Sequence, residues 1–177
     1  MNRQIIPFPL PVYLATYFGN RLATIPTKLR DGSHKNPFLV SGHNDYGDYI
    51  LRHLTVAHAP HIYKGKHPFF ISVSNWQGNT NWHNVSGKRN FICLDNIAVK
   101  KVTEKLNAAF RAHMITFVRG AESVTSSKSE NKRVRTLAIR NFCEENHVIY
   151  SDKNLVAWKK MCQRNKHKPK TLIYSTL

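Results

Sequence analysis

Four cations of the last predicted helix share one side of it, and cations at this spacing can bind phosphate groups. At 100° per residue they fall within about 80° of one another. They are Lys153, Lys160, Arg164 and Lys168. The apolar residues of the same helix fall on the opposite side: Leu155, Trp158 and Cys162. The pattern predicts a helix that packs by one face and presents a row of positive charge on the other.

A second predicted helix precedes this one and carries Arg133 and Arg140 on its outward face, one heptad apart. Two short helices of which the second is basic are typical of a helix-turn-helix motif, whose second helix enters the major groove. The connection at 147–152 is longer than the usual turn of about three or four residues, and the outward face has few Asn, Gln or Ser side chains for base edges. Three interpretations stay open: base reading in the groove, phosphate binding alone, and a solvated basic face.

A second group of cations lies among aromatic residues at 63–70, with Trp76 and Trp82 nearby in the sequence. Aromatic rings between cations can stack unpaired bases, although such rings more often belong to a core. Taking both regions together, the predicted nucleic-acid-binding residues are Arg133, Arg140, Lys153, Lys159, Lys160, Arg164, Lys166, Lys168, Lys170, Lys64, Lys66, Lys88 and Arg89.

The histidines His53, His58 and His61 lie close together in the sequence, with Asp45 and Asp48 as the nearest carboxylates. Catalytic zinc normally takes about three protein ligands, and metal-dependent nucleases also need a cluster of carboxylates. Three histidines and two carboxylates are few for a metal-dependent nuclease. We expect no metal site here and keep a nuclease or strand-transfer enzyme only as a second alternative.

Motifs for nucleophilic catalysis or nucleotide binding are absent from the sequence: it contains no G-x-S-x-G, no G-x-x-x-x-G-K-[ST] and no G-x-G-x-x-G. The three cysteines, Cys93, Cys143 and Cys162, form no C-x-x-C pair and are predicted to be buried, reduced thiols of an intracellular protein. We expect a protein that is not an enzyme and binds no cofactor.

The composition favours a polyanionic partner. There are 27 Lys and Arg against 10 Asp and Glu, a formal net charge of +17, and 41% of the residues are hydrophobic. That hydrophobic content is enough for a folded core, so the charge belongs to a folded protein. Between Lys128 and Lys170 twelve cations stand against four carboxylates, a local excess of eight. Nucleic acid, with DNA favoured over RNA, is the expected partner rather than a membrane.

The N-terminal half predicts a small sheet. Three prolines favour an extended lead-in, 12–18 is predicted to be a helix or strand that Gly19 ends, and the Pro- and Gly-rich stretch 24–47 is predicted to be loops around one strand. Period-two alternation predicts strands at 68–76 and 91–94 in an antiparallel arrangement.

The rest of the sequence, after residue 94, is predicted to be mainly helical. Asp95 or Asn96 can cap a long helix that runs to about Val118, whose apolar arc includes His113 as a core histidine. The first helix of the C-terminal pair is predicted to face inward with Val134, Leu137, Ala138 and Phe142. The predicted class is α+β: a small antiparallel sheet covered by one long helix and followed by a C-terminal helix pair of helix-turn-helix type. The predicted parts are an α+β body at 1–119, a flexible linker at 120–131, a basic helical pair at 132–168 and an extended arm at 169–177.

Two segments resemble a known group of proteins. PFPLPVYLATYF at 7–18 and LAIRNFCEENHVIYSDKNLVAWKKMCQR at 137–164 resemble the two ends of small basic proteins carried by phages and mobile elements of gut Bacteroidetes, a family without an established activity. The resemblance covers about forty residues. It implies a DNA-associated role in a phage or mobile element, and it transfers no catalytic residue.

The sequence therefore predicts a DNA-binding regulatory or accessory protein of the cytoplasm of a host cell, or one associated with a phage particle. The alternative is a structural protein of a phage particle or nucleoprotein assembly, with its basic surface against packaged nucleic acid. The apolar tail that begins at Leu172 and ends at Leu177 would provide self-association in that case.

Overall fold

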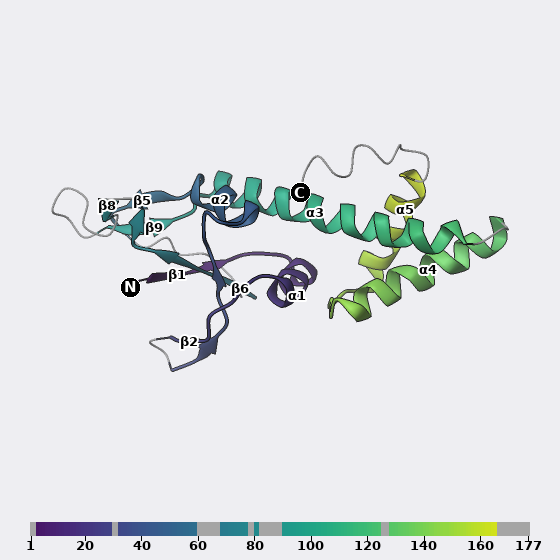
Figure 1. The fold of residues 1–177 in the computed structure, drawn as a ribbon, viewed down its shortest axis with the longest axis horizontal. Helices are drawn as coiled ribbons and strands as arrows, with labels where there is room; N and C mark the ends of the chain where they lie inside the picture. Colours follow the sequence, from purple (N-terminus) through teal and green to yellow (C-terminus); the bar gives the residue numbers. More distant parts are fainter. Residues whose placement is uncertain are drawn as a thin grey trace. The chain divides into compact units, whose positions relative to one another are not determined.

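The computed structural model describes residues 3–29, 32–59, 68–77, 80–81, 90–124 and 128–165. It contains both helices and short strands, so the predicted α+β class is confirmed (Figure 1). The helices are α1 (Val12–Arg21), α2 (Asp45–Leu51), α3 (Asn96–Ser123), α4 (Lys128–Glu145) and α5 (Asp152–Arg164). The strands are β1 (Arg3–Phe8), β2 (Thr27–Lys28), β3 (His34–Lys35), β4 (Phe38–Leu39), β5 (Thr55–Ala57), β6 (Phe69–Ser74), β7 (Trp76–Gln77), β8 (Thr80–Asn81) and β9 (Phe91–Cys93).

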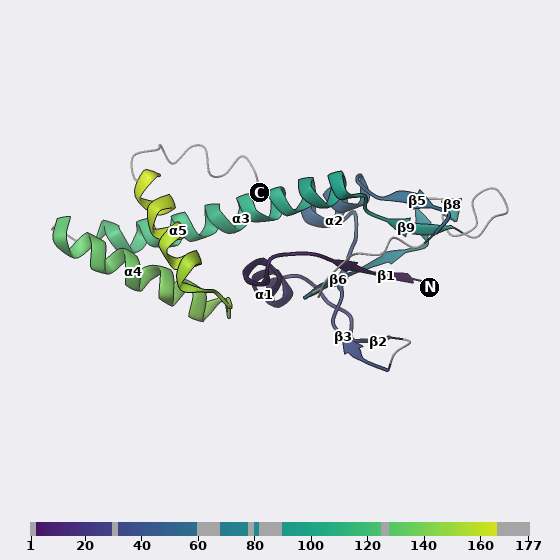
Figure 2. The ribbon, with the colours of Figure 1, turned by 180° about the vertical axis from the view of Figure 1, so that it is seen from behind.

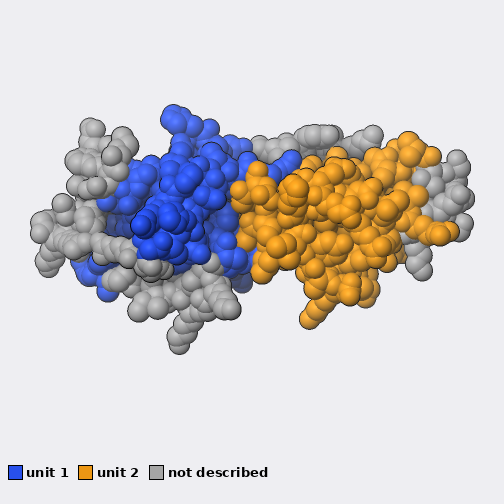
Figure 3. All heavy atoms as spheres, turned by 90° about the horizontal axis from the view of Figure 1, so that it is seen from below, with its two compact units in different colours: residues 1–11, 21–105 blue, residues 12–20, 106–177 orange. Residues whose placement is uncertain are grey.

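The chain forms two compact units that interleave along the sequence (Figure 3). Unit 1 consists of Met1–Pro11 and Arg21–Lys105, and unit 2 consists of Val12–Asn20 and Leu106–Leu177. Helix α3 thus contributes its first part to unit 1 and its second part to unit 2. This grouping differs from the predicted order of a body at 1–119 and a separate helix pair, because α1 belongs with the C-terminal helices.

Strand β6 is the central strand of a three-stranded sheet in unit 1, in the order β1-β6-β4. The predicted extended lead-in is β1, which pairs with β6 antiparallel and places Ile6 opposite Ile71. Strand β4 pairs with β6 in parallel, which the sequence did not predict. Strand β9 pairs with β5 in a separate sheet, so the two strands with the clearest alternation have different partners.

The stretch 24–47 holds more regular structure than the predicted loops. Strands β2 and β3 form an antiparallel hairpin, and Asn44 caps α2 by accepting the Gly47 N–H at 2.6 Å. Gly47 is required there, because a Cβ atom at this position would lie 2.0 Å from the carbonyl oxygen of Ser41.

Helix α3 starts as predicted, with the Asp95 carboxylate accepting the N–H of Ala98 at 2.7 Å. Every fourth residue of the helix is then buried: Ala98, Val102, Leu106, Phe110, Met114 and Val118. The series continues to Glu122, so the predicted end near Val118 is wrong and the helix runs to Ser123. The predicted flexible connection is correspondingly reduced, since 120–123 and 128–131 are helical. Buried Glu122, near the end of α3, pairs with Arg135 of α4 and so joins the two helices.

Unit 2 is a group of helices around aromatic side chains. Helix α4 runs beside the second part of α3, and α5 crosses α4 in both views (Figures 1 and 2). The ring of Phe110 lies 5.1 Å from that of Tyr17 and 5.8 Å from that of Phe142. The prediction of a satisfied histidine is confirmed, because His113 Nδ1 lies 2.7 Å from the Tyr17 hydroxyl.

The inward face of α4 is rotated relative to the prediction. Ala138 and Phe142 are buried as expected, but Leu137 is 59% exposed, and Ile139 is fully buried in its place. The cause is Arg135, whose polar type suggested solvent but whose guanidinium is buried against Glu122. Helix α1 also differs in one detail, since it continues to Arg21 beyond the glycine predicted to end it.

Candidate nucleic-acid interface

A capping box fixes the start of α5. The Asn154 N–H donates to the Ser151 hydroxyl at 3.3 Å, and the Ser151 N–H donates to the Asn154 side-chain oxygen at 3.0 Å. These bonds satisfy backbone groups that the first turn of a helix leaves without an intrahelical partner. The predicted inward face is confirmed, because Leu155, Trp158 and Cys162 are all buried.

The indole of Trp158 sets the rotation of α5 about its own axis. Its ring centroid lies 5.4 Å from that of Tyr13 in α1, 5.3 Å from that of Phe110 in α3 and 5.8 Å from that of Tyr150 before α5. Edge-to-face and tilted aromatic contacts of this kind add stabilisation beyond the buried area. With Trp158 held inside, the opposite side of α5 has to face outward.

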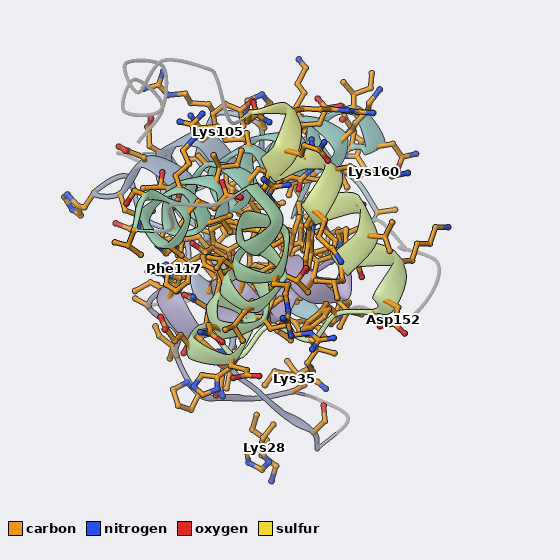
Figure 4. All side chains as sticks on the ribbon, turned by 90° about the vertical axis from the view of Figure 1, so that its right-hand side faces the viewer. Lys28, Lys35, Lys105, Phe117, Asp152 and Lys160 are labelled. Carbon is orange, nitrogen blue, oxygen red and sulfur yellow. The ribbon has the colours of Figure 1, made fainter. Side chains whose placement is uncertain are left out.

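That opposite side carries the predicted cations. Lys153, Lys160 and Arg164 are exposed, and the small residue Ala157 is exposed between them. Figure 4 labels Lys160 on this helix. We call Lys153, Lys160 and Arg164 the α5 row. At 1.5 Å of rise per residue the row extends about 16 Å, the axial distance covered by roughly five phosphates of one DNA strand. Lys159, also predicted to bind, is only partly exposed and lies about 100° from Lys160 around the helix axis, on the side of Asp152.

Helix α4 packs against α5 and contributes two further exposed cations, Arg133 and Arg140, as predicted. The exposed side chain of Leu137 lies between them on the same side of the helix. One turn beyond Arg140 is the exposed carboxylate of Glu144, which would repel a phosphate. The cationic part of α4 is therefore confined to about its first four turns.

A polar cluster of three residues in α3 and α4 connects these helices to the end of α5. Glu122 accepts from Arg135 at 2.7 Å (Nε) and 2.6 Å (Nη2), with side-chain exposures of only 7% and 11%. Arg119 donates to the backbone carbonyl of Asn165, which caps α5. We call Arg119, Glu122 and Arg135 the polar lock.

Sequence reasoning missed the polar lock. The available signal was the spacing of Glu122, four residues after the last member of the buried series in α3. Arg135 was included in the local charge excess, although not among the predicted binding residues, and its charge is neutralised by the carboxylate. Its pairing lowers the number of cations that α4 can offer to a ligand.

Several residues that the sequence predicts to bind nucleic acid lie outside the described residues, and their role stays a prediction. They are Lys166, Lys168 and Lys170 after α5, and Lys64, Lys66, Lys88 and Arg89 in unit 1. The tail at 172–177 also lies outside, so the self-association it would provide in a structural protein stays a prediction.

The histidine cluster is engaged in hydrogen bonds where the structure describes it. His53 Nδ1 lies 2.8 Å from the carbonyl oxygen of Tyr49, and His58 Nδ1 lies 3.0 Å from Asn90 Oδ1. Asp48 forms an ion pair with Arg52 at 2.8 Å. No group of three or more His, Cys, Asp or Glu side chains suited to a metal ion occurs among the described residues, which do not include His61.

The three cysteines are free and buried. Burial raises the pKa of the Cys143 thiol to about 12, with Glu144 adding to the shift. Burial likewise raises the pKa of the Cys162 thiol to about 11. Both thiols are therefore protonated at neutral pH and are poor nucleophiles.

Comparison with protein-family models, curated proteins and solved structures finds no match for this chain. The resemblance to phage and mobile-element proteins therefore stays a prediction. No helix in the described part of the chain has the length and apolar character needed to cross a bilayer.

Proposed function

We propose that this protein binds duplex DNA through the α5 row and acts as a regulatory or accessory factor. The observation that carries the proposal is the division of α5 into a buried aromatic and aliphatic face and an exposed face whose charges are all positive. The only carboxylate of the helix, Asp152, lies about 100° from Lys153 around the helix axis. A rigid helix with this charge distribution complements a row of phosphates.

Two uncharged side chains beside the α5 row support contact with base edges. Gln163 is exposed and can bond bidentately to adenine, and Val156 is 52% exposed and can contact a thymine methyl group. Both lie on the same flank of the row. The proposal therefore includes a modest preference for A·T-containing sites, with most of the affinity from phosphates.

The setting that we propose is the cytoplasm of a host cell. Support comes from the three free, buried thiols, which persist in a reducing compartment. The net charge of +17 supports a polyanionic ligand of some length.

The first experiment measures the affinity of the full chain for duplex DNA across several salt concentrations. Engagement of about six to eight cations would give a log–log slope of roughly −5 to −7. Lys160→Ala/Arg164→Ala should reduce the magnitude of that slope by about two, because each phosphate contact contributes about 0.9. The fraction of helix, measured by circular dichroism, should not change, since both side chains are exposed.

A matched control is Lys100→Ala/Lys101→Ala, which removes two exposed cations from α3. It lowers the net charge by the same amount but leaves α5 intact, so its slope should stay within about one of the original. Equal losses in both variants would show that only the overall charge matters, and an unchanged slope for the α5 variant would remove the α5 row from the proposal.

A further inference from the structure

The outward side of α4 carries four exposed residues at a spacing typical of contacts between helices. Arg133, Leu137, Arg140 and Glu144 fall within about 60° of one another around the helix axis. Their successive intervals of four, three and four residues are those of the a and d positions of a coiled coil. We call these four residues the α4 stripe. A seam at this spacing is suited to a second helix that lies along α4.

The centre of the α4 stripe is apolar and its two ends have opposite charge. Leu137 is 59% exposed, although leucine is among the residues most often buried. Arg133 lies one turn before it, and Glu144 lies two turns after it. A helix that covered the leucine and carried the reverse order of charge would match the whole stripe.

The charged residues of the α4 stripe have no ion pair among the residues that the structure describes. Arg140 and Glu144 lie four residues apart, a spacing that allows an ion pair along one helix, yet none is formed. Glu144 also lies in the last turn of α4, where the helix dipole disfavours a carboxylate. A cation from outside this copy of the chain would offset that cost.

We propose that the α4 stripe is a contact between two copies of this chain, with the two α4 helices antiparallel about a two-fold axis. When the axis passes midway between Leu137 and Arg140, Arg133 of each copy faces the partner's Glu144. Arg133 and Glu144 are about 16 Å apart along either helix, so both ion pairs form at once. At the centre, Leu137 packs against the aliphatic part of the partner's Arg140.

The charges favour this arrangement over a parallel one. Parallel helices would place Arg133 beside the partner's Arg133 and Glu144 beside the partner's Glu144, and like charges in contact repel each other. The net charge of +17 opposes association at a distance. At about 0.15 M salt, however, charges more than about 8 Å apart are largely screened, whereas charges in contact are screened less.

This contact goes beyond the proposed function, because it uses no residue of the α5 row and needs no DNA. It also gives Arg133 and Arg140, which the sequence predicts to bind nucleic acid, a different role.

The test exchanges the two charges at the ends of the stripe. Arg133→Glu places a carboxylate opposite the partner's Glu144, and Glu144→Arg places a cation opposite the partner's Arg133, so each variant alone has like charges at both ends. In an equimolar mixture of the two variants, the two introduced charges pair at one end and the two native charges pair at the other. Both side chains are exposed, so the fraction of helix should not change.

Sedimentation of the full chain in about 0.15 M salt measures its association from about 10 to 500 μM. The contact is small, so we expect a weak dimer with a dissociation constant on the order of 100 μM. Each single variant should weaken association at least about tenfold, and the mixture should regain it. The matched control is Arg111→Glu, the same change of charge at an exposed site of α3, which should associate like the native chain.

Three results would overturn the inference: a native chain that stays monomeric throughout this range, a dimer that persists in both single variants, or a mixture of the variants that stays monomeric. None of them bears on the α5 row. Salt-dependent binding of DNA by a monomeric chain, reduced in Lys160→Ala/Arg164→Ala, would leave the proposed function standing without this contact.

Discussion

Glu122→Gln should destabilise the helices of unit 2 by about 3–5 kcal/mol. The substitution keeps the size of the side chain but removes the negative charge that faces Arg135 at 2.6–2.7 Å. Because the guanidinium is only 11% exposed, it would be left as a buried charge without a counter-charge. Breaking a buried ion pair from one side costs about this amount, which is a large share of a typical stability of about 5–15 kcal/mol.

The assay is urea unfolding followed by circular dichroism at a helix-sensitive wavelength. With a slope of about 2 kcal/mol per molar urea, the midpoint should fall by roughly 2 M. The control is Glu122→Met/Arg135→Met, which replaces both charges by apolar groups and should regain most of the stability. A loss below about 1 kcal/mol for Glu122→Gln would mean that the pair behaves as a solvated surface pair, and the reasoning from burial would then be wrong.

Two further predictions concern glycines and thiols. Gly47→Ala should destabilise the protein by about 1–3 kcal/mol, because its Cβ would lie 2.0 Å from Ser41, whereas Gly120→Ala, at an exposed helical site with nothing within 4 Å, should stabilise it by about 0.5–1 kcal/mol. Thermal unfolding of the two variants checks both signs, and equal shifts would contradict the packing at Gly47. Raising the pH above 9 should lower the free energy of unfolding by about 1.4 kcal/mol per pH unit for each of Cys143 and Cys162. The reason is that a thiol of the unfolded chain, with a pKa of 9.0, ionises in this range. The buried thiols, with pKa values of about 12 and 11, keep their protons. Stability measured from pH 8 to 10.5 should decline less steeply in Cys143→Ala, and an identical decline would show that this thiol ionises in the folded state.

The spacing of apolar residues in the sequence was enough to predict which side chains are buried where one helix face is uniformly apolar. In α5 the residues Leu155, Trp158 and Cys162 are buried as the 3.6-residue period predicts, and the cations opposite them are exposed. In α4 the same argument failed at Leu137, because the rotation of the helix depends on Arg135, a charged residue that is buried by its ion pair with Glu122 of the preceding helix.

Strand pairing was less predictable because it depends on contacts between distant segments. The alternation in β6 was clear, but nothing in it indicates that β1 and β4, from the first forty residues, are its neighbours in opposite orientations. The β2–β3 hairpin did have a local signal in the sequence, since an Asp-Gly pair such as that at 31–32 is typical of hairpin turns. The surrounding prolines, Pro26 and Pro37, instead suggested irregular loops.

The interleaving of the two units has a consequence for synthesis on the ribosome. Helix α1 is made early, but the partners of Tyr13 in unit 2, Phe110 and Trp158, are made roughly 100 to 150 residues later. At a translation rate of about 10 residues per second, α1 would remain without these aromatic contacts for on the order of ten seconds or longer. Unit 2 can therefore close only after nearly all the described chain has been translated, and a separately produced C-terminal fragment would lack the helix that completes its aromatic core.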